Sequence, residues 1–155
     1  MTQIDTGREN SLHERDPQVY TISGAAMAVH GQLGPGFLES AYQEPSTADF
    51  EIADIPCRHE VPLETRYRDR VLSCRYKADP VCYDSVIVEL KAGDRLDTVH
   101  QAQVINYRKT TGLQRALLLN FGSTRLEYKR IVLNYRQRSS ASSADETQNA
   151  DDTGR

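Results

Sequence analysis

Two carboxylates and an amine lie close together in the segment KADPVCYDSVIVELK, residues 77–91. If residues 83–85 form the turn of a β-hairpin, positions equally distant from its centre face one another, and Asp79 lies opposite Glu89. Opposite Cβ atoms are about 4.5–5.5 Å apart, where like charges repel. A divalent cation between them would turn that repulsion into coordination, and Lys91 shares the face of Glu89 because strand side chains repeat with period two. Such a site suits metal-assisted hydrolysis of a phosphodiester.

The same pattern has a simpler interpretation. An alternating strand with Glu and Lys turned outward also describes a half-exposed antiparallel sheet, with Val86, Val88 and Leu90 on the buried face. Mg²⁺ sites often use only one or two carboxylates together with water. The hairpin alone therefore leaves both interpretations open.

The length of 155 residues suits one domain with a single core. Residues 1–15 are polar and aperiodic, and residues 137–155 are acidic and of low complexity, so we expect both ends to lack fixed structure and residues 16–136 to form the domain.

Three cysteines without a CxxC spacing indicate reduced thiols in the cytoplasm, and they argue against a structural zinc site. No apolar stretch approaches the roughly 18 residues of a membrane span. No glycine-rich phosphate loop predicts a nucleotide cofactor.

The net charge of −3 is unevenly distributed. The last part of the predicted domain, residues 101–138, is basic, with a single acid, Glu127, among eight bases: Arg108, Lys109, Arg115, Arg125, Lys129, Arg130, Arg136 and Arg138. This asymmetry is typical of a surface that binds phosphate backbones, and equally of a solvated helix face beside a basic strand end.

The first half of the domain is predicted to be helical. Asp16-Pro17 is a helix start, and apolar residues then recur every three or four positions until Gly34 ends the helix; they are Val19, Ile22, Ala26, Val29 and Leu33. A second helix is expected from about Leu38, with a kink or a break at Pro45 because proline removes a backbone donor.

The second half is predicted to hold strands at 57–67, 71–79 and 85–92, then a helix capped by Asp97 or Thr98 that ends at Gly112, a buried strand at 116–121 and another strand from 126. The middle strand should bury one face that joins the buried face of residues 86–90; its members are Leu72, Cys74, Tyr76 and Ala78. Pro80 predicts a bulge or an edge position beside Asp79. The fold class is therefore α/β, with a three-stranded meander, a right-handed crossover helix and further strands, flanked by helices.

On the crossover helix, Gln103 and Tyr107 are four residues apart and share one side. Together they could donate hydrogen bonds to a phosphate oxygen. The alternative is that Tyr107 packs in the core while Gln103 faces water. For His30, on the first helix, packing is the default role.

An ordered set of motifs resembles a known family. Residues 36–42 read GxxExxY, His30 precedes LGPG, and Asp79, the Glu-x-Lys triplet and Asn120-Phe121 follow in order. Over roughly residues 19–134 the chain resembles the GxxExxY proteins, which are placed in the PD-(D/E)XK nuclease-like superfamily. The resemblance implies a restriction-endonuclease-like core.

The resemblance also implies roles for particular residues. Asp79 and Glu89 would be metal ligands for Mg²⁺ or Mn²⁺, with Glu39 as an additional acid and ligand, and Lys91 would position or polarise the attacking water. Gln103 and Tyr107 would steady the substrate backbone, and His30 would support the site from behind it.

The implied activity is a metal-dependent nuclease that hydrolyses phosphodiester bonds of DNA or RNA. The alternatives are a catalytically silent nuclease-like module that binds nucleic acid or a partner protein, and a structural dimerisation domain. A homodimer is compatible with each of these functions.

Overall fold

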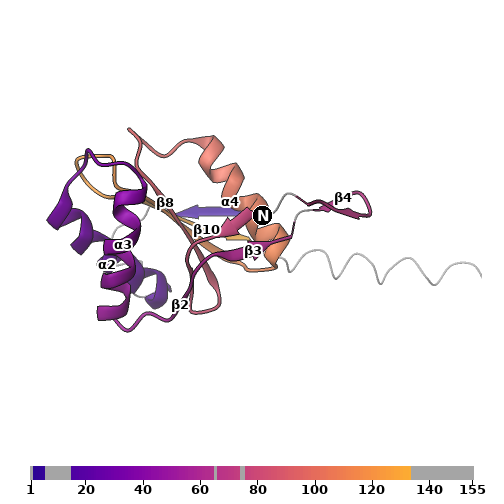
Figure 1. The fold of residues 1–155 in the computed structure, drawn as a ribbon, viewed down its shortest axis with the longest axis horizontal. Coiled ribbons are helices and arrows are strands. Elements are labelled where there is room, and N and C mark those ends of the chain that lie inside the picture. Colours follow the sequence, from indigo (N-terminus) through magenta and orange to yellow (C-terminus); the bar gives the residue numbers. More distant parts are fainter. Residues whose placement is uncertain (1, 6–14, 65, 74–75, 134–155) are drawn as a thin grey trace, which may run out of the picture.

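The structure is a computed structural model that describes residues 2–5, 15–64, 66–73 and 76–133. Helices cover both faces of a six-stranded sheet with the strand order β1-β10-β9-β8-β7-β2 (Figure 1). The elements are β1 (Thr2–Asp5), α2 (Pro17–Leu33), α3 (Ser40–Ile52), β2 (Cys57–Arg58), β3 (Val61–Leu63), β4 (Arg66–Tyr67), β5 (Arg70–Val71), β6 (Tyr76–Ala78), β7 (Val81–Cys82), β8 (Val86–Lys91), α4 (Thr98–Thr111), β9 (Arg115–Asn120) and β10 (Glu127–Leu133).

The centre of the sheet is the parallel pair β8–β9, and α4 is the crossover between these two strands. The other neighbouring strands pair antiparallel. Asp97 starts α4 by accepting a hydrogen bond from the backbone N–H of His100 (2.9 Å), and Gly112 follows the helix with a positive φ of 74°. These features confirm the predicted α/β class with its crossover helix and flanking helices.

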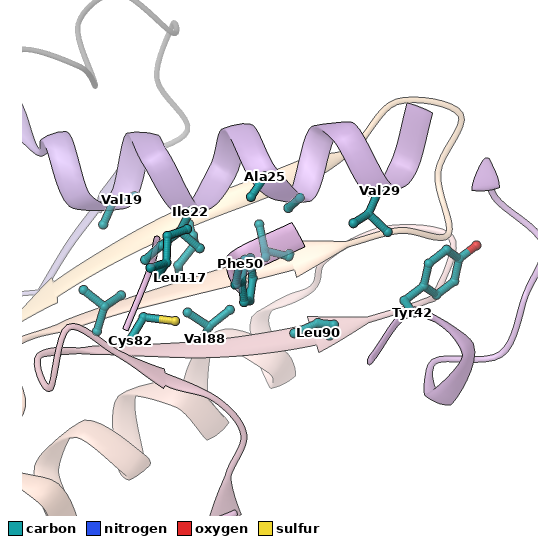
Figure 2. Packing of buried hydrophobic residues seen from close by; sticks show 14 of the residues in the cluster. Val19, Ile22, Ala25, Val29, Tyr42, Phe50, Cys82, Val88, Leu90 and Leu117 are labelled. Carbon is teal, nitrogen blue, oxygen red and sulfur yellow. The ribbon is translucent and has the colours of Figure 1, made fainter. Parts of the chain in front are cut away.

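Each face of the sheet has its own apolar core. Helices α2 and α3 cover one face, where Val88, Leu90 and Leu117 meet Val19 and Phe50 (Figure 2). Helix α4 covers the other face, where Val104 and Tyr107 pack with residues of the central strands; these are Ile87, Ala116 and Leu118. Consecutive residues of β8 and β9 are therefore buried on both sides, as uniformly apolar strands require.

Helix α2 begins as its sequence predicts. The Asp16 side chain accepts a hydrogen bond from the backbone N–H of Val19 (3.2 Å), and Pro17 takes the first helical position. Four of the five predicted apolar residues are buried, whereas Leu33 at the last turn is 37% exposed. No helix among the described residues is long and apolar enough to cross a membrane.

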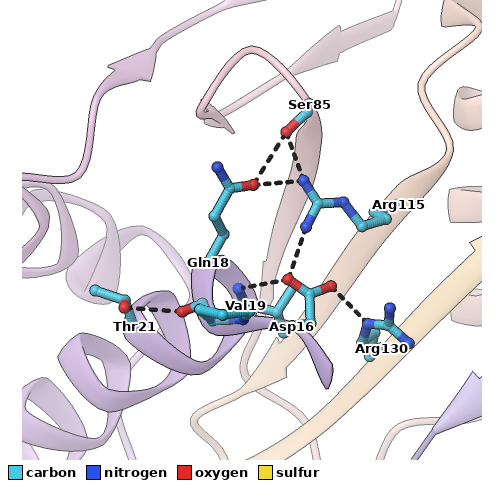
Figure 3. Close-up of polar contacts among 8 residues, drawn as sticks. Asp16, Gln18, Val19, Thr21, Ser85, Arg115 and Arg130 are labelled. Carbon is cyan, nitrogen blue, oxygen red and sulfur yellow. Dashed lines mark hydrogen bonds and ion pairs between the residues drawn. The ribbon is translucent and has the colours of Figure 1, made fainter. Parts of the chain in front are cut away.

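Asp16 also anchors the helix to the sheet (Figure 3). Its two carboxylate oxygens accept bonds from Arg115 of β9 (2.7 Å) and Arg130 of β10 (2.8 Å). Burial raises the pKa of Asp16, but the hydrogen bonds from Arg130, Val19 and Arg115 outweigh it and hold the pKa below its ordinary value. Arg115 and Arg130, two of the eight basic residues between positions 101 and 138, therefore stabilise the fold.

Helix α3 runs through Pro45 without the predicted break. Pro45 lies near the start of the helix, and the donor that it lacks would have bonded to the carbonyl of Ala41, which is exposed and can bind water instead. The proline is therefore tolerated within the helix.

The strands before β8 form one bent hairpin. The pairs β2–β7 and β3–β6 keep the same register, but the ladder is interrupted at residues 59–60 and 79–80, and β4–β5 pair by themselves beyond it. The meander is therefore split among three sheets, and Figure 1 shows its tip, β4–β5, projecting away from the body.

The predicted buried face of the middle strand is wrong. Leu72 is exposed, and Ala78 is buried on the α4 side, opposite the face of Val86 and Val88. Cys74 and the side chain of Tyr76 lie outside the described residues. The interruption at Asp79-Pro80 separates β6 from β7, so side chains do not alternate continuously between the two faces of the sheet from β6 to β7.

The N-terminal residues are not wholly without structure, contrary to the prediction for residues 1–15. Thr2–Asp5 form β1, which pairs antiparallel with β10 at the edge of the sheet. Backbone hydrogen bonds to a free strand edge do not need apolar periodicity, so the sequence carried no signal for them. Residues 6–14 and the acidic tail 137–155 lie outside the described residues.

Cys57 and Cys82 are directly opposite each other in β2 and β7, and their free thiols are 3.0 Å apart at the sulfur atoms. Burial raises the pKa of both thiols, most strongly that of Cys82. They are therefore protonated near neutral pH.

Candidate active site

Glu89 and Lys91 lie at the carboxyl end of β8, on the strand face that α4 covers. Glu89 is half-buried. Burial raises its pKa to about 7; the ammonium of Lys91 opposes this rise, while the negative charges of Glu39 and Asp79 add to it. Lys91, Glu39 and Asp79 therefore lie close enough to Glu89 for their charges to affect its pKa.

Asp79 reaches this place through the hairpin that the sequence predicted. Residues 81 and 82 pair with 87 and 86, the backbone N–H of Val88 donates to the carbonyl of Pro80 (3.0 Å), and the turn is at Tyr83 and Asp84, both with positive φ. The register thus extends to the residue beside Asp79, as predicted. The Asp79-Pro80 peptide bond is cis, and the ladder ends there.

His59 is the partner of Asp79 that the sequence did not reveal. Its Nδ1 lies 2.8 Å from the Asp79 carboxylate. His59 has no Cys or His at ligand spacing, so its only sequence signal would have been the strand register, which brings residues 59–60 opposite 79–80. His59 lies between β2 and β3, and its hydrogen bond holds the Asp79 carboxylate in place.

Glu39 is brought to the site by the turn between α2 and α3. Gly36 has a φ of 108°, which favours glycine, and the buried Tyr42 holds the turn through its hydroxyl. This hydroxyl donates to the carbonyl of Gly34 (2.7 Å) and accepts from the N–H of Phe37 (3.3 Å). Glu39 makes no side-chain capping bond at the start of α3, so its carboxylate is not used by the helix.

The crossover helix contributes Gln103, whose Oε1 lies 3.5 Å from the Lys91 Nζ. Gln103 therefore orients the ammonium of Lys91. Tyr107 is buried in the core on the α4 side of the sheet. This position fits the alternative in which Tyr107 packs in the core and does not bind a phosphate.

Asn120 fixes the backbone that follows Lys91. Asn120 is fully buried, and its side chain bonds to both the N–H and the carbonyl of Gly93 (3.0 Å each) and to the N–H of Gly122 (3.1 Å). The backbone N–H of Phe121 also donates to the Lys91 carbonyl (2.8 Å). Asn120 thus joins the loop after β8 to the loop after β9, a role for the Asn-Phe pair that the sequence alone could not specify.

His30 supports this second loop. Its Nε2 lies 2.9 Å from the carbonyl of Ser123, and its ring lies against Phe121 with centroids 6.2 Å apart. His30 is buried, and its hydrogen bond and ring contact are with this loop.

The residue types fit a divalent cation. Burial raises the pKa of Glu89 most, and the negative charges of Glu39 and Asp79 raise it further, so a cation bound beside Glu89 would stabilise its charged form. Among the residues that the structure describes, however, no three His, Cys, Asp or Glu side chains stand close enough to hold one ion together. One or two carboxylates with water are a common Mg²⁺ arrangement.

A family model described as the PD-(D/E)XK nuclease superfamily matches residues 16–131. The chain therefore belongs to the PD-(D/E)XK nuclease superfamily, and its mixed sheet with helices on both faces is consistent with a restriction-endonuclease-like fold. No curated protein and no solved structure matches the chain.

Proposed function

We propose that this protein is a nuclease that uses Mg²⁺ or Mn²⁺ to hydrolyse phosphodiester bonds of DNA or RNA. The proposal is supported by the environment of Glu89, which lies with Lys91 at the carboxyl end of β8 and whose pKa is affected by the charges of Lys91, Glu39 and Asp79. Membership of the nuclease superfamily supports the same reaction.

The residues of the proposed site have different roles. Asp79 and Glu89 would hold the cation together with water, with Glu39 as a further acid nearby; the cation when bound would polarise a phosphoryl oxygen and lower the pKa of water. Lys91, oriented by Gln103, places a fixed positive charge where the transition state gains negative charge. His59 keeps the Asp79 carboxylate directed.

Matched substitutions of acids test the assignment. Asp79→Asn and Glu89→Gln are expected to lower the rate of Mg²⁺-dependent cleavage by roughly a hundredfold or more, the scale for loss of a transition-state contact. Asp84→Asn in the exposed turn and Glu44→Gln on α3 change the same chemical groups outside the site and should leave the rate within about twofold. Cleavage of labelled DNA and RNA, single- and double-stranded, measures the rates. Equal rates in all four variants would refute the site.

A second candidate is a module that binds nucleic acid or a partner protein without cutting. The absence of a three-ligand metal group among the described residues favours it. In that case nucleic-acid binding would persist in EDTA and in Asp79→Asn, and no cleavage would appear with either metal.

A further inference from the structure

Exposed apolar side chains are concentrated in the turn that leads to Glu39. Leu33 is 37% exposed, Phe37 51% and Leu38 81%, all within six consecutive residues. The described residues include other large exposed apolar side chains, among them Val99, one helical turn before Gln103 on α4. Grouped apolar exposure of this kind marks an interaction surface.

The turn presents these side chains from a fixed backbone. Tyr42 has no solvent exposure, stacks on Phe121 with ring centroids 4.7 Å apart, and ties both sides of the turn together through its hydroxyl. The ring of Phe37 contacts the Tyr42 ring edge-on, with centroids 6.0 Å apart and planes at 82°. Phe37 is thus partly anchored, and Leu38 is held in solvent.

The position of the turn limits what can cover it. The Phe37 ring contacts Tyr42, Tyr42 stacks on Phe121, and the backbone N–H of Phe121 donates to the carbonyl of Lys91 (2.8 Å), so the turn lies beside the carboxyl end of β8. A nucleic-acid strand with a phosphate at this end of β8 can therefore place its neighbouring groups beside Phe37 and Leu38. A phosphate or a sugar would gain little from apolar side chains, whereas a base has an apolar face that stacks on them.

We propose that the turn formed by residues 33–38 contacts unstacked bases beside the phosphate that is cut, and so selects single-stranded nucleic acid over intact duplex. In the interior of a duplex both faces of each base are already stacked, so the turn finds no partner there. This inference rests on the proposed nuclease function, and it adds the substrate class.

A fluorescent reporter tests the contact without depending on cleavage. The chain contains no tryptophan, so Leu38→Trp introduces a single one. Without metal, a single-stranded oligonucleotide should quench its fluorescence, and a blunt duplex of the same sequence should not. Ile52→Trp, at the other end of α3 and 78% exposed in the native residue, is the control and should respond to neither.

Cleavage provides the second readout. Phe37→Ala should lower the rate on single strands about tenfold, within the range of one lost base–aromatic stack, and change the rate on duplex less than about twofold. Ile52→Ala should change neither rate. Thermal melting of each variant verifies that it is folded.

The outcomes separate the two proposals. If the wild type cuts neither substrate but Leu38→Trp is quenched by single strands, the nuclease function fails and the base contact stands. If the wild type cuts but quenching is absent or equal with duplex, the contact is refuted and the function stands. A turn that serves a protein partner would leave both the fluorescence and the cleavage ratio unchanged, which also refutes the contact.

Discussion

Glu89 makes the stability of the metal-free protein depend on pH. Its pKa is about 7 in the folded protein, against an ordinary value of 4.5, so between these values the folded state binds a proton that the unfolded state has lost. The stabilisation is fully present below about pH 4.5 and is lost as the pH rises through about 7.

We therefore expect the free energy of unfolding to fall between pH 5 and pH 8, by on the order of 2–3 kcal/mol from this group. Urea denaturation in EDTA measures the fall. In Glu89→Gln most of it should disappear, and subtraction of the two curves removes the contributions of the histidines. Parallel curves for the two proteins would show that Glu89 does not have the raised pKa.

Asp16 is expected to dominate the stability among the acids of the fold. In Asp16→Asn the helix cap is kept but Arg115 and Arg130 lose their counter-charge, which should cost about 3–5 kcal/mol of unfolding free energy, the scale for breaking a buried pair. Asp84→Asn disrupts the exposed pair with Arg58 and should cost less than about 1 kcal/mol. Similar losses in the two variants would contradict the anchoring role.

At the residue level, the sequence predicted what depends on local spacing. The predicted hairpin centred on Asp84 has the expected register, with residues 81 and 82 opposite 87 and 86, because equal distances from a turn determine pairing. It could not predict His59 or the role of Asn120. His59 meets Asp79 through the register of a second hairpin, and Asn120 meets Gly93 because two loops approach each other. Both contacts join residues far apart in the sequence, so no local pattern predicts them.

Among the elements, the two loops at the carboxyl edge of β8 and β9 are packed backbone against backbone. A Cβ atom at Gly122 would collide with the carbonyl oxygen of Gly93 and lie 2.6 Å from its nitrogen. We expect Gly122→Ala to destabilise the protein by at least about 2 kcal/mol and to displace the loop after Lys91.

Gly24→Ala is the matched control for this prediction. Gly24 lies within α2 with nothing within 4 Å of an added Cβ, so alanine there should stabilise the protein by about 0.5–1 kcal/mol through helix propensity. Chemical denaturation measures both variants, and cleavage should fall only in Gly122→Ala. A harmless Gly122→Ala would mean that the loops are not closely held.

Elements with a strong local pattern were predicted well, and those shaped by their partners were not. Asp16-Pro17 and Gly34 bound α2, and the apolar run from Ala116 forms the buried strand β9. The hairpin before β8 was predicted as long strands with an irregularity only at Pro80, but its ladder is also interrupted at residues 59–60. Helix α3 continues through Pro45, where the carbonyl left without a donor belongs to the exposed residue Ala41.

For the whole molecule, β1 closes one edge of the sheet. Removal of residues 1–5 would expose the backbone donors and acceptors of β10, which can pair with another chain. We expect the shortened protein to unfold at lower urea concentration and to associate more strongly with rising concentration in analytical ultracentrifugation. An unchanged midpoint together with unchanged association would show that β1 contributes nothing to the sheet.

The pairing of Asp16 also has a consequence for the order of events during translation. Its second arginine, Arg130, is added 114 positions later, in the strand that also receives β1. A nascent chain that ends after α4 therefore contains Asp16 but neither Arg115 nor Arg130, and it lacks β9 and β10 of the sheet. Ribosome-bound intermediates that stop before Arg130 are expected to remain sensitive to protease, and protection should arise only once that residue has left the exit tunnel.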